Sequence, residues 1–335
     1  MFVNSRSWLS GRGGTSGRRL RLSAAHDEWN HVGIALAAID LGYFADEGLD
    51  DVELITFPED TGELLDREAM QVNLIAEGTV DIGIDPRTTF VLEAKDQKRP
   101  VCIVAARRKN HAFVLFGQKG LKSIEELRGA TLMTGHRGGA NDVMLRQVLQ
   151  DSGIVPDEDV TITYTGGPMH DTYRTTQAFR AGEHGPAFLA PTAEVPGLIE
   201  DGFPILADLR VLYPARHDRV TAANERFVSE HPDLLKAYLR GMLRACRYVL
   251  EPDNGPQFKE MVQRAGFLNT EPQQLAFDSL LEGWQSRGST DLALPREGVE
   301  LILKEGQEAG TLSSNLRVDE VLRLEVLGEA QRELA

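Results

Sequence analysis

The chain has 335 residues, of which 36 are basic and 51 acidic, so its formal net charge at pH 7 is −15. Such an acidic body repels nucleic acid and anionic membrane surfaces, and we expect neither as a partner. No stretch approaches the roughly 18 consecutive apolar residues that a membrane-spanning helix needs, so we expect no insertion into a membrane. A chain of this length is typical of two domains rather than one.

The N-terminal segment is rich in Gly, Ser and Arg, and this composition predicts a disordered arm at residues 1–18. Its arginines are typical of the basic region of a signal peptide, but the apolar run that should follow is too short. As written, the sequence therefore predicts a cytoplasmic protein. An incorrect start site or a removed leader would instead place the protein in the periplasm or on a lipid anchor.

From Arg19 onward, short β-type runs alternate with helical patterns. Strands are predicted at residues 21–25, 52–57 and 80–84, and helices at residues 32–46, 65–77 and 88–96. A second series follows, with strands at residues 130–135, 160–164 and 186–190 and helices at residues 141–152 and 172–181. This alternation is typical of mostly parallel sheets covered by helices on both faces. The predicted fold class is α/β, with two doubly wound sheets.

Two extended segments, residues 101–117 and 203–215, lie where one series stops and the other starts. We expect them to be hinge strands between two lobes, with residues 19–107 and 216–335 in lobe one and residues 108–215 in lobe two. The remaining sequence is helical, and one apolar stripe at helical spacing predicts a buried face; it contains Leu235, Tyr238, Leu239, Met242, Cys246 and Val249. Cys102 and Cys246 are expected to be buried small hydrophobes.

Four loops that follow predicted strands gather polar residues at the edge where open α/β sheets bind ligands. The first loop contains His26, Glu28, Trp29, Asn30 and His31, the second Arg87 and Thr88, the third His136, Arg137, Gly138 and Gly139, and the fourth His170. Asn30 is expected to cap the helix that follows it. Because arginine pairs with carboxylates and sulfonates and helix N-termini favour negative charge, the sequence predicts a small anionic ligand in a cleft between the lobes.

These residues also have structural interpretations, which stay open. Gly138 and Gly139 suit an ordinary tight turn, Arg87 and Arg137 suit structural or solvated roles, and Trp29 suits either a core wedge or a stacking wall. No HExxH or HxH pattern occurs, so we expect no metal and no cofactor. No GxSxG motif occurs, and neither cysteine lies in a strand-end loop beside a histidine.

Five stretches follow one another along the chain: LGYFADEGL (41–49), AEGTVDIGI (76–84), LKSIEELRGATLMTG (121–135), AFRAGEHGPAFLAPTAEVPGLIEDGFPILADL (178–209) and RFVSEHPDLLKAYLRGMLRACRYV (226–249). Together they resemble the type II periplasmic solute-binding proteins, in the branch that serves nitrate, sulfonate, taurine and thiamine-precursor uptake. The resemblance implies a two-lobed fold that closes on its ligand through the four loops. If the protein is exported, it also implies docking on an ABC permease.

The same fold serves cytoplasmic enzymes, namely aromatic sulfinate desulfinases, dihydroxyphthalate decarboxylases and the pyrimidine synthase of thiamine biosynthesis. Desulfinases carry a cysteine in the first loop, where this chain has HDEWNH, although Arg67 matches one of their arginines. Pyrimidine synthases carry a cysteine-rich iron motif, and this chain has only two cysteines.

We therefore favour a protein that binds a carboxylate or sulfonate, aromatic ligands included. The alternative is a cofactor-free lyase that removes a carboxylate or sulfinate group from an aromatic ring. In that alternative, Arg67, Arg87 or Arg137 holds the anion, and His31 or Glu28 manages the proton.

Overall fold

The chain forms two units in the computed structural model. The structure describes residues 6–10, 19–57, 64–106, 113–135, 137–164, 172–191, 194–216, 219–269, 274, 277–278, 280–282, 284–285 and 290–334. Unit 1 contains Met1–Lys109, Ala215–Phe267 and Arg287–Ala335, and unit 2 contains Asn110–Pro214 and Leu268–Ser286. The lobes expected from the sequence differ from this division mainly at residues 268–286, because a helical pattern does not say which body it joins.

The described strands of unit 1 form a six-stranded sheet of order β1-β3-β2-β4-β11-β5. They are β1 (Arg6–Ser10), β2 (Leu20–Ala24), β3 (Val52–Thr56), β4 (Ile82–Gly83), β5 (Val101–Ala105) and β11 (Thr221–Asn224). Strand β2 pairs in parallel with both β3 and β4, whereas β11 runs antiparallel between β4 and β5. The carboxyl ends of β2, β3 and β4 therefore meet at one edge of the sheet.

Strand β1 corrects the expectation that residues 1–18 form a disordered arm. Its residues pair antiparallel with β3, from Arg6 opposite Thr56 to Ser10 opposite Val52. Without β1, strand β3 would be the edge strand and would leave a row of backbone N–H and C=O groups unpaired. Pairing with an open edge uses the backbone, so the composition of the segment was a poor guide.

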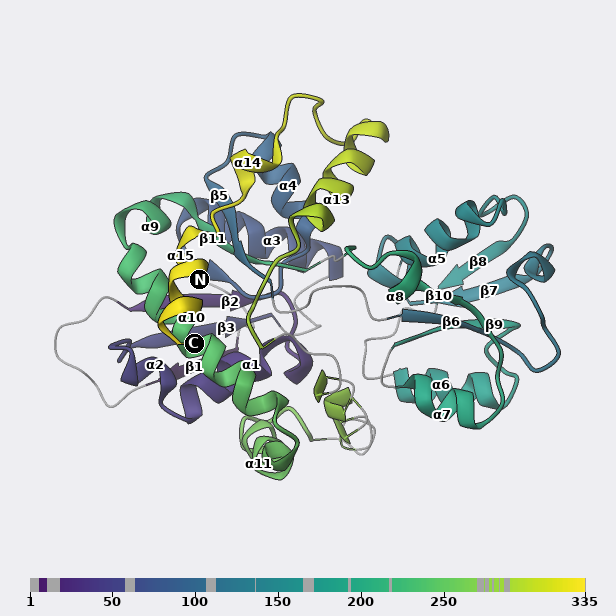
Figure 1. Cartoon of the computed structure of the whole chain (residues 1–335), viewed down its shortest axis with the longest axis horizontal. Coiled ribbons are helices and arrows are strands. Elements are labelled where there is room, and N and C mark those ends of the chain that lie inside the picture. Colours follow the sequence, from purple (N-terminus) through teal and green to yellow (C-terminus); the bar gives the residue numbers. More distant parts are fainter. Residues whose placement is uncertain are drawn as a thin grey trace. The chain divides into compact units, whose positions relative to one another are not determined.

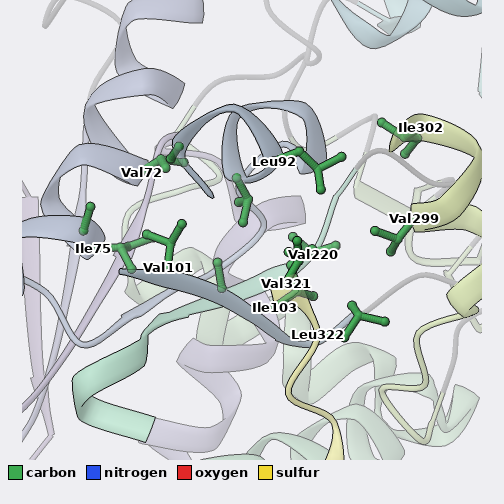
Figure 2. Close-up of a cluster of buried hydrophobic side chains, with 14 of the residues drawn as sticks. Val72, Ile75, Leu92, Val101, Ile103, Val220, Val299, Ile302, Val321 and Leu322 are labelled. Carbon is green, nitrogen blue, oxygen red and sulfur yellow. The ribbon is translucent and has the colours of Figure 1, made fainter. Parts of the chain in front are cut away.

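Helices cover both faces of this sheet (Figure 1). One face carries α3 (Leu64–Glu77), α4 (Thr88–Asp96), α13 (Arg296–Glu308) and α14 (Val318–Val321). Figure 2 shows their apolar side chains, such as Val72, Leu92 and Ile302, meeting Ile103 of β5 in one buried cluster. The other face carries α1 (Trp29–Asp40), α2 (Tyr43–Asp46), α10 (Pro232–Leu250), α11 (Gly255–Arg264) and α15 (Glu325–Glu333), which pack on one another, and α9 (Glu225–Glu230) precedes α10.

The apolar stripe predicted on α10 is confirmed, because all of its members are buried: Leu235, Tyr238, Leu239, Met242, Cys246 and Val249. Cys102 and Cys246 are both buried, as predicted. Burial raises the pKa of Cys102 to about 12, so this thiol stays protonated at neutral pH. No helix among the described residues is long and apolar enough to span a bilayer.

The first helix begins earlier and ends earlier than the sequence predicts. Helix α1 starts at Trp29 with Glu28 as its N-cap, so Asn30 lies in the first turn instead of capping it. Gly42 adopts a left-handed φ of 74° and separates α1 from α2, and Gly48 follows α2 with a φ of 83°. The single helix predicted at residues 32–46 is therefore two helices, because the first of two glycines already breaks it.

Gly241 of α10 allows the ring of Phe44 to lie against the helix backbone. A Cβ at this position would lie 2.5 Å from Cδ1 and 2.8 Å from Cε1 of that ring. The ring is fully buried and stacks on Tyr238 with 5.7 Å between centroids, so it has little room to move.

We expect Gly241→Ala to lower the free energy of unfolding by about 1–2 kcal/mol, because overpacking against a ring with so little room costs about 2–3 kcal/mol, the upper part of the usual range, and the gain in helix propensity offsets about 1 kcal/mol. Urea unfolding measures the change. The control is Gly328→Ala in α15, where the new Cβ would meet only the end of the Arg332 side chain, at 3.4 Å. The control should be neutral or stabilising, and equal effects at both sites would contradict the prediction.

In unit 2 the described strands form a sheet of order β10-β6-β9 and a parallel pair, β7 and β8. They are β6 (Phe113–Gly117), β7 (Thr131–Thr134), β8 (Thr161–Tyr164), β9 (Ala187–Pro191) and β10 (Ile205–Asp208). Strand β6 runs antiparallel to both of its neighbours. Its Leu115 packs with α5 (Ala140–Asp151), and its Phe116 packs with α6 (Thr172–Arg180) and α7 (Val195–Glu200). Helices thus cover both faces here too.

The two segments expected to be extended hinge strands are only partly extended. In the segment 203–215, strand β10 is followed by the short helix α8 (Leu209–Leu212), which Asp208 caps by accepting the backbone N–H of Arg210 at 3.0 Å. In the segment 101–117, strands β5 and β6 are present, and residues 107–112 lie outside the described part of the chain.

Candidate functional site

Buried and half-buried polar side chains gather at the carboxyl ends of β2, β3 and β4. Most members lie at the ends of these strands or in the segments that follow them. Others lie on helix α3, and one lies just before β11. Ligands of open α/β sheets bind at this edge. We call the group the carboxyl-edge cluster, and its members are His26, Asp27, His31, Thr56, Arg67, Glu68, Gln71, Asp85, Arg87, Thr88 and Arg219.

Glu68 lies at the centre of the cluster and has no exposed surface. Its Oε1 accepts a hydrogen bond from Nε2 of His26 at 3.1 Å and forms an ion pair with Nη2 of Arg219 at 2.7 Å. Its Oε2 accepts a hydrogen bond from Nε of Arg87 at 2.8 Å. Burial by itself raises the pKa of this carboxyl, but Arg219, the hydrogen bond to His26 and Arg87 together hold it well below its usual range. Glu68 is therefore a carboxylate shared by two arginines.

The backbone brings the two arginines to the same carboxylate. Arg87 and Arg219 form an antiparallel backbone bridge, and the N–H of Val220 donates to the carbonyl of Pro86 at 3.1 Å. Arg219 also donates from Nη1 to the carbonyl of Asp85 at 3.0 Å. Arg87, expected in a ligand-binding loop, thus takes part in an internal ion pair, and it is the N-cap residue of α4.

His26 and His31 stack face to face, with ring centroids 3.9 Å apart and an interplanar angle of 8°. His31 Nδ1 lies 3.1 Å from Oδ2 of Asp85. Burial and then the charge of Arg219 lower the pKa of His26 to about 4. Burial and then the neighbouring His26 lower the pKa of His31 well below its usual value. Both imidazoles are therefore neutral at pH 7.

Asp85 has an unusual backbone that points its carboxylate at His31. Its φ of 59° is left-handed, a region that costs a residue with a side chain about 1 kcal/mol or more. Helix α4 begins three residues later, at Thr88, and the imidazole of His31 binds the carboxylate of Asp85.

Arg67 is held at the ends of two strands and is only 7% exposed. Its Nη1 donates to the carbonyl of Ala25 at 3.3 Å and to the carbonyl of Phe57 at 3.0 Å. Its Nε is buried and has no acceptor among the described residues. A buried donor without a partner costs about 1–3 kcal/mol, and Nε lies on the edge of the guanidinium that binds carboxylates side-on. Arg67 therefore offers a fixed donor that no described residue satisfies.

Thr88 presents a second unsatisfied polar atom in the same cluster. It is the first residue of α4 and is fully buried, and its Oγ1 has no hydrogen-bond partner in the described part of the chain. The first N–H groups of a helix also lack intrahelical partners, which makes its N-terminus favourable for anions. Thr88 thus adds a hydroxyl donor at a favourable position.

Two further contacts hold the strand ends together. Gln71 Nε2 donates to the carbonyl of Ser23 at 2.8 Å and to the carbonyl of Ile84 at 3.0 Å, which ties the end of β2 to the end of β4. Thr56 Oγ1 donates to Oδ1 of Asp27 at 2.6 Å, which ties β3 to the loop after β2. These contacts hold the ends of β2, β3 and β4 together beside the histidines and Arg67.

The remaining residues of the first loop lie on α1. Trp29 is buried and packs edge-to-face on Phe258 of α11, with 6.1 Å between centroids, the geometry expected of a core wedge. Asn30 is buried in the first turn. Glu28 is half-buried, and its carbonyl accepts from the N–H of His31 at 3.0 Å.

The glycine-rich loop of the second series belongs to unit 2. Gly138 has a left-handed φ of 71°, and its N–H donates to Oδ2 of Asp142 at 2.8 Å. Gly139 is the N-cap of α5, and Arg137 is exposed. A carboxylate thus already lies at this helix N-terminus and opposes a further anion there, as in an ordinary capped turn. His136 and His170 lie outside the described residues.

Glu68, Gln71, Asp85 and Arg219 were not among the predicted site residues. Glu68 and Gln71 share one face of α3 with Arg67, so a polar group on that face was a usable signal. Arg219 offered none, because it reaches Asp85 across 134 positions of sequence. Within the described ranges, no group of three or more His, Cys, Asp and Glu side chains is placed to hold a metal ion.

The chain matches a family model described as NMT1/THI5 like over residues 28–254. A search of the curated proteins gives no significant match. Among solved structures, it resembles a putative sulfonate ABC transporter periplasmic sulfonate-binding protein, SsuA, from Methylobacillus flagellatus KT, with 17% identity, coverage of 95% of this chain and 94% of that chain, and a TM-score of 0.67.

Two further structures have similar scores. The periplasmic nitrate-binding protein NrtA from Synechocystis PCC 6803 is 15% identical, with 94% of this chain and 89% of that chain covered and a TM-score of 0.65. The alkanesulfonate-binding protein SsuA from Xanthomonas axonopodis pv. citri, bound to MOPS, is 16% identical, with 92% of this chain and 100% of that chain covered and a TM-score of 0.61. At these identities the likeness concerns the fold, and it confirms the predicted α/β periplasmic-binding-protein fold.

Proposed function

The chain belongs to the NMT1/THI5-like family, and we propose that it is a solute-binding protein that holds a small organic anion at the carboxyl-edge cluster. The observation that carries the proposal is the buried Nε of Arg67, which lacks an acceptor among the described residues. The neighbours in fold support it, because their names describe proteins that bind sulfonates or nitrate.

The charges of the cluster explain why Arg67 is the residue that needs a ligand. Arg87 and Arg219 share the carboxylate of Glu68. Arg67 donates only to main-chain carbonyls and pairs with no carboxylate of the described residues. A buried cation without a counter-ion is costly, and an anionic ligand supplies the missing charge. A carboxylate or sulfonate offers the two oxygens that the side edge of a guanidinium binds.

Thr88 supports the same location from another element. Its buried hydroxyl and the N-terminus of α4 add a donor and a partial positive charge to the edge that carries Arg67. If the protein is exported, an ABC permease is the partner that we infer from the neighbours in fold. The neighbours in fold do not favour the lyase alternative, because their names describe binding proteins.

We expect Arg67→Gln to weaken anion binding by about 10- to 100-fold, which is the loss of one charge-assisted hydrogen bond worth about 1.5–3 kcal/mol. Isothermal titration with benzoate, benzenesulfonate, propane-1-sulfonate and 2-hydroxyethanesulfonate measures the change for each anion that binds.

The matched control is Arg264→Gln, because Arg264 is exposed and pairs with Asp40 on the surface. It should leave every affinity unchanged. If Arg67→Gln also left them unchanged, the anion would bind elsewhere. Release of carbon dioxide or sulfite from an aromatic carboxylate or sulfinate would show catalysis and overturn a purely binding function.

A further inference from the structure

We propose that the ligand of the carboxyl-edge cluster carries a hydrogen-bond donor, a hydroxyl or amino group, besides its anionic group, and that His26 and His31 accept the bond from this donor. This inference rests on the proposed anion-binding function. It narrows the ligand class from small organic anions to hydroxy- or amino-substituted ones, and it assigns a role to the stacked histidine pair.

The carboxylates fix which nitrogen of each ring carries the proton. A carboxylate only accepts hydrogen bonds, so His26 donates from Nε2 to Glu68 and His31 donates from Nδ1 to Asp85. A neutral imidazole carries one N–H, so His26 Nδ1 and His31 Nε2 hold lone pairs. Neither of these two atoms is hydrogen-bonded to any residue that the structure describes. The pair therefore offers two acceptors.

The surroundings keep these two atoms acceptors at neutral pH. Protonation would turn them into donors, but the charges of Arg219, from before β11, and Arg67, from α3, act on the His26 ring. Arg87, from the start of α4, pairs with the same Glu68 that binds His26. Glu68 from α3 and Asp85 from the loop after β4 already bind the opposite ring nitrogens. Burial and the charge of Arg219 lower the pKa of His26 to about 4, in agreement with this arrangement.

The acceptors lie beside the anion-binding edge. Arg67 binds the carbonyl of Ala25, the residue before His26, and its charge acts on the His26 ring. An anion without a donor, such as nitrate, would bring oxygen lone pairs towards imidazole lone pairs. A hydroxyl or amino group on the ligand removes this conflict and satisfies an acceptor. A site built to pair with a ligand donor discriminates strongly against analogues that lack it.

The test uses pairs of anions that differ only by a donor. Propane-1-sulfonate carries a methyl group where 2-hydroxyethanesulfonate carries a hydroxyl, and 4-methylbenzenesulfonate carries one where 4-aminobenzenesulfonate carries an amino group. Isothermal titration at pH 7.5 gives the four affinities for the full chain. We expect the donor-bearing member of at least one pair to bind tenfold or more tightly than its methyl counterpart.

Two variants remove the acceptor nitrogen of one ring and keep the hydrogen bond that this ring donates to its carboxylate. His31→Asn keeps an N–H donor towards Asp85 and removes Nε2, and His26→Gln keeps a donor towards Glu68 and removes Nδ1. In at least one variant, the preference for the donor-bearing anion over its methyl counterpart should fall below threefold.

If both methyl counterparts bound the wild-type protein as tightly as their donor-bearing partners, or more tightly, the inference would be overturned. This comparison uses the wild-type protein alone and does not depend on the folding of a variant. A preference that survives in both variants would also overturn it. If the paired anions bind equally and Arg67→Gln weakens both, the proposed function stands without this narrower ligand class. If none of the four anions binds, the proposed function fails as well.

Discussion

Replacing Glu68 by glutamine is expected to lower the free energy of unfolding by about 3–5 kcal/mol, because the change leaves two buried cations without their counter-ion. Glu68 has no exposed surface, and its carboxylate forms ion pairs with Arg87 at 2.8 Å and with Arg219 at 2.7 Å. Glutamine has nearly the same shape as glutamate, so the fall in the free energy of unfolding measures the loss of the charge and not the creation of a cavity. Its amide N–H would also face a guanidinium donor, which cannot accept a hydrogen bond.

Urea unfolding of Glu68→Gln should be compared with Glu300→Gln. Glu300 pairs with Arg296 on the surface of α13 at 2.7 Å, with both side chains 46% exposed. Exposed pairs at this spacing contribute about 0.3–0.5 kcal/mol, so the control should change stability very little. A loss below about 1 kcal/mol in Glu68→Gln would show that Arg87 and Arg219 do not depend on this carboxylate.

The stability of the protein should fall by about 3 kcal/mol between pH 6.5 and pH 4 through His26 alone, because its pKa drops from 6.5 to about 4 on folding. The unfolded chain then binds a proton that the folded protein does not. Above about pH 7.5 the imidazole is neutral in both states, so no loss arises there. About 2 kcal/mol of the change lies between pH 7 and pH 5.

The pKa of His31 is also lowered and acts in the same direction. Glu68 contributes separately: its folded pKa is lowered, so its stabilisation is lost only as the pH falls below its ordinary value of 4.5. A loss of stability that begins near pH 6.5 therefore comes from the protonation of histidines in the unfolded chain. His184 in unit 2, whose pKa is lowered by burial, adds a smaller loss in the same range.

Urea unfolding at pH 7, 6 and 5 checks this expectation. His26→Gln should flatten the dependence by about 2 kcal/mol over this interval, because glutamine does not titrate. His231→Gln, outside the cluster, should keep the wild-type slope. If His26→Gln kept that slope, His26 would not be the neutral buried imidazole described above.

Periodicity and turn residues predicted most of the elements near the cluster. A strand at residues 52–57 and a helix at residues 88–96 agree closely with β3 and α4. In unit 2, the strand expected at residues 130–135 agrees with β7. The buried stripe of α10 followed from apolar spacing alone. These features depend on near neighbours in sequence, and the order of the strands placed the polar loops at one edge of the parallel strands.

Strand β1 and the break at Gly42 were missed for physical reasons. Pairing of residues 6–10 depends on an open edge at β3, which exists only after the sheet has formed. Gly42 and Gly48 both allow a left-handed turn, and the sequence does not say which one ends a helix.

The sequence by itself determined the α/β class, the loops that carry polar residues and several members of the cluster, including His26, His31, Arg67 and Arg87. Their roles were decided by tertiary structure. Arg87 is neutralised by Glu68, which Arg219 also contacts from a distant part of the chain, whereas Nε of Arg67 has no acceptor among the described residues. Hydrogen bonds and charge pairs act over a few ångströms of space irrespective of sequence separation, so only the folded chain shows which arginine still lacks an acceptor.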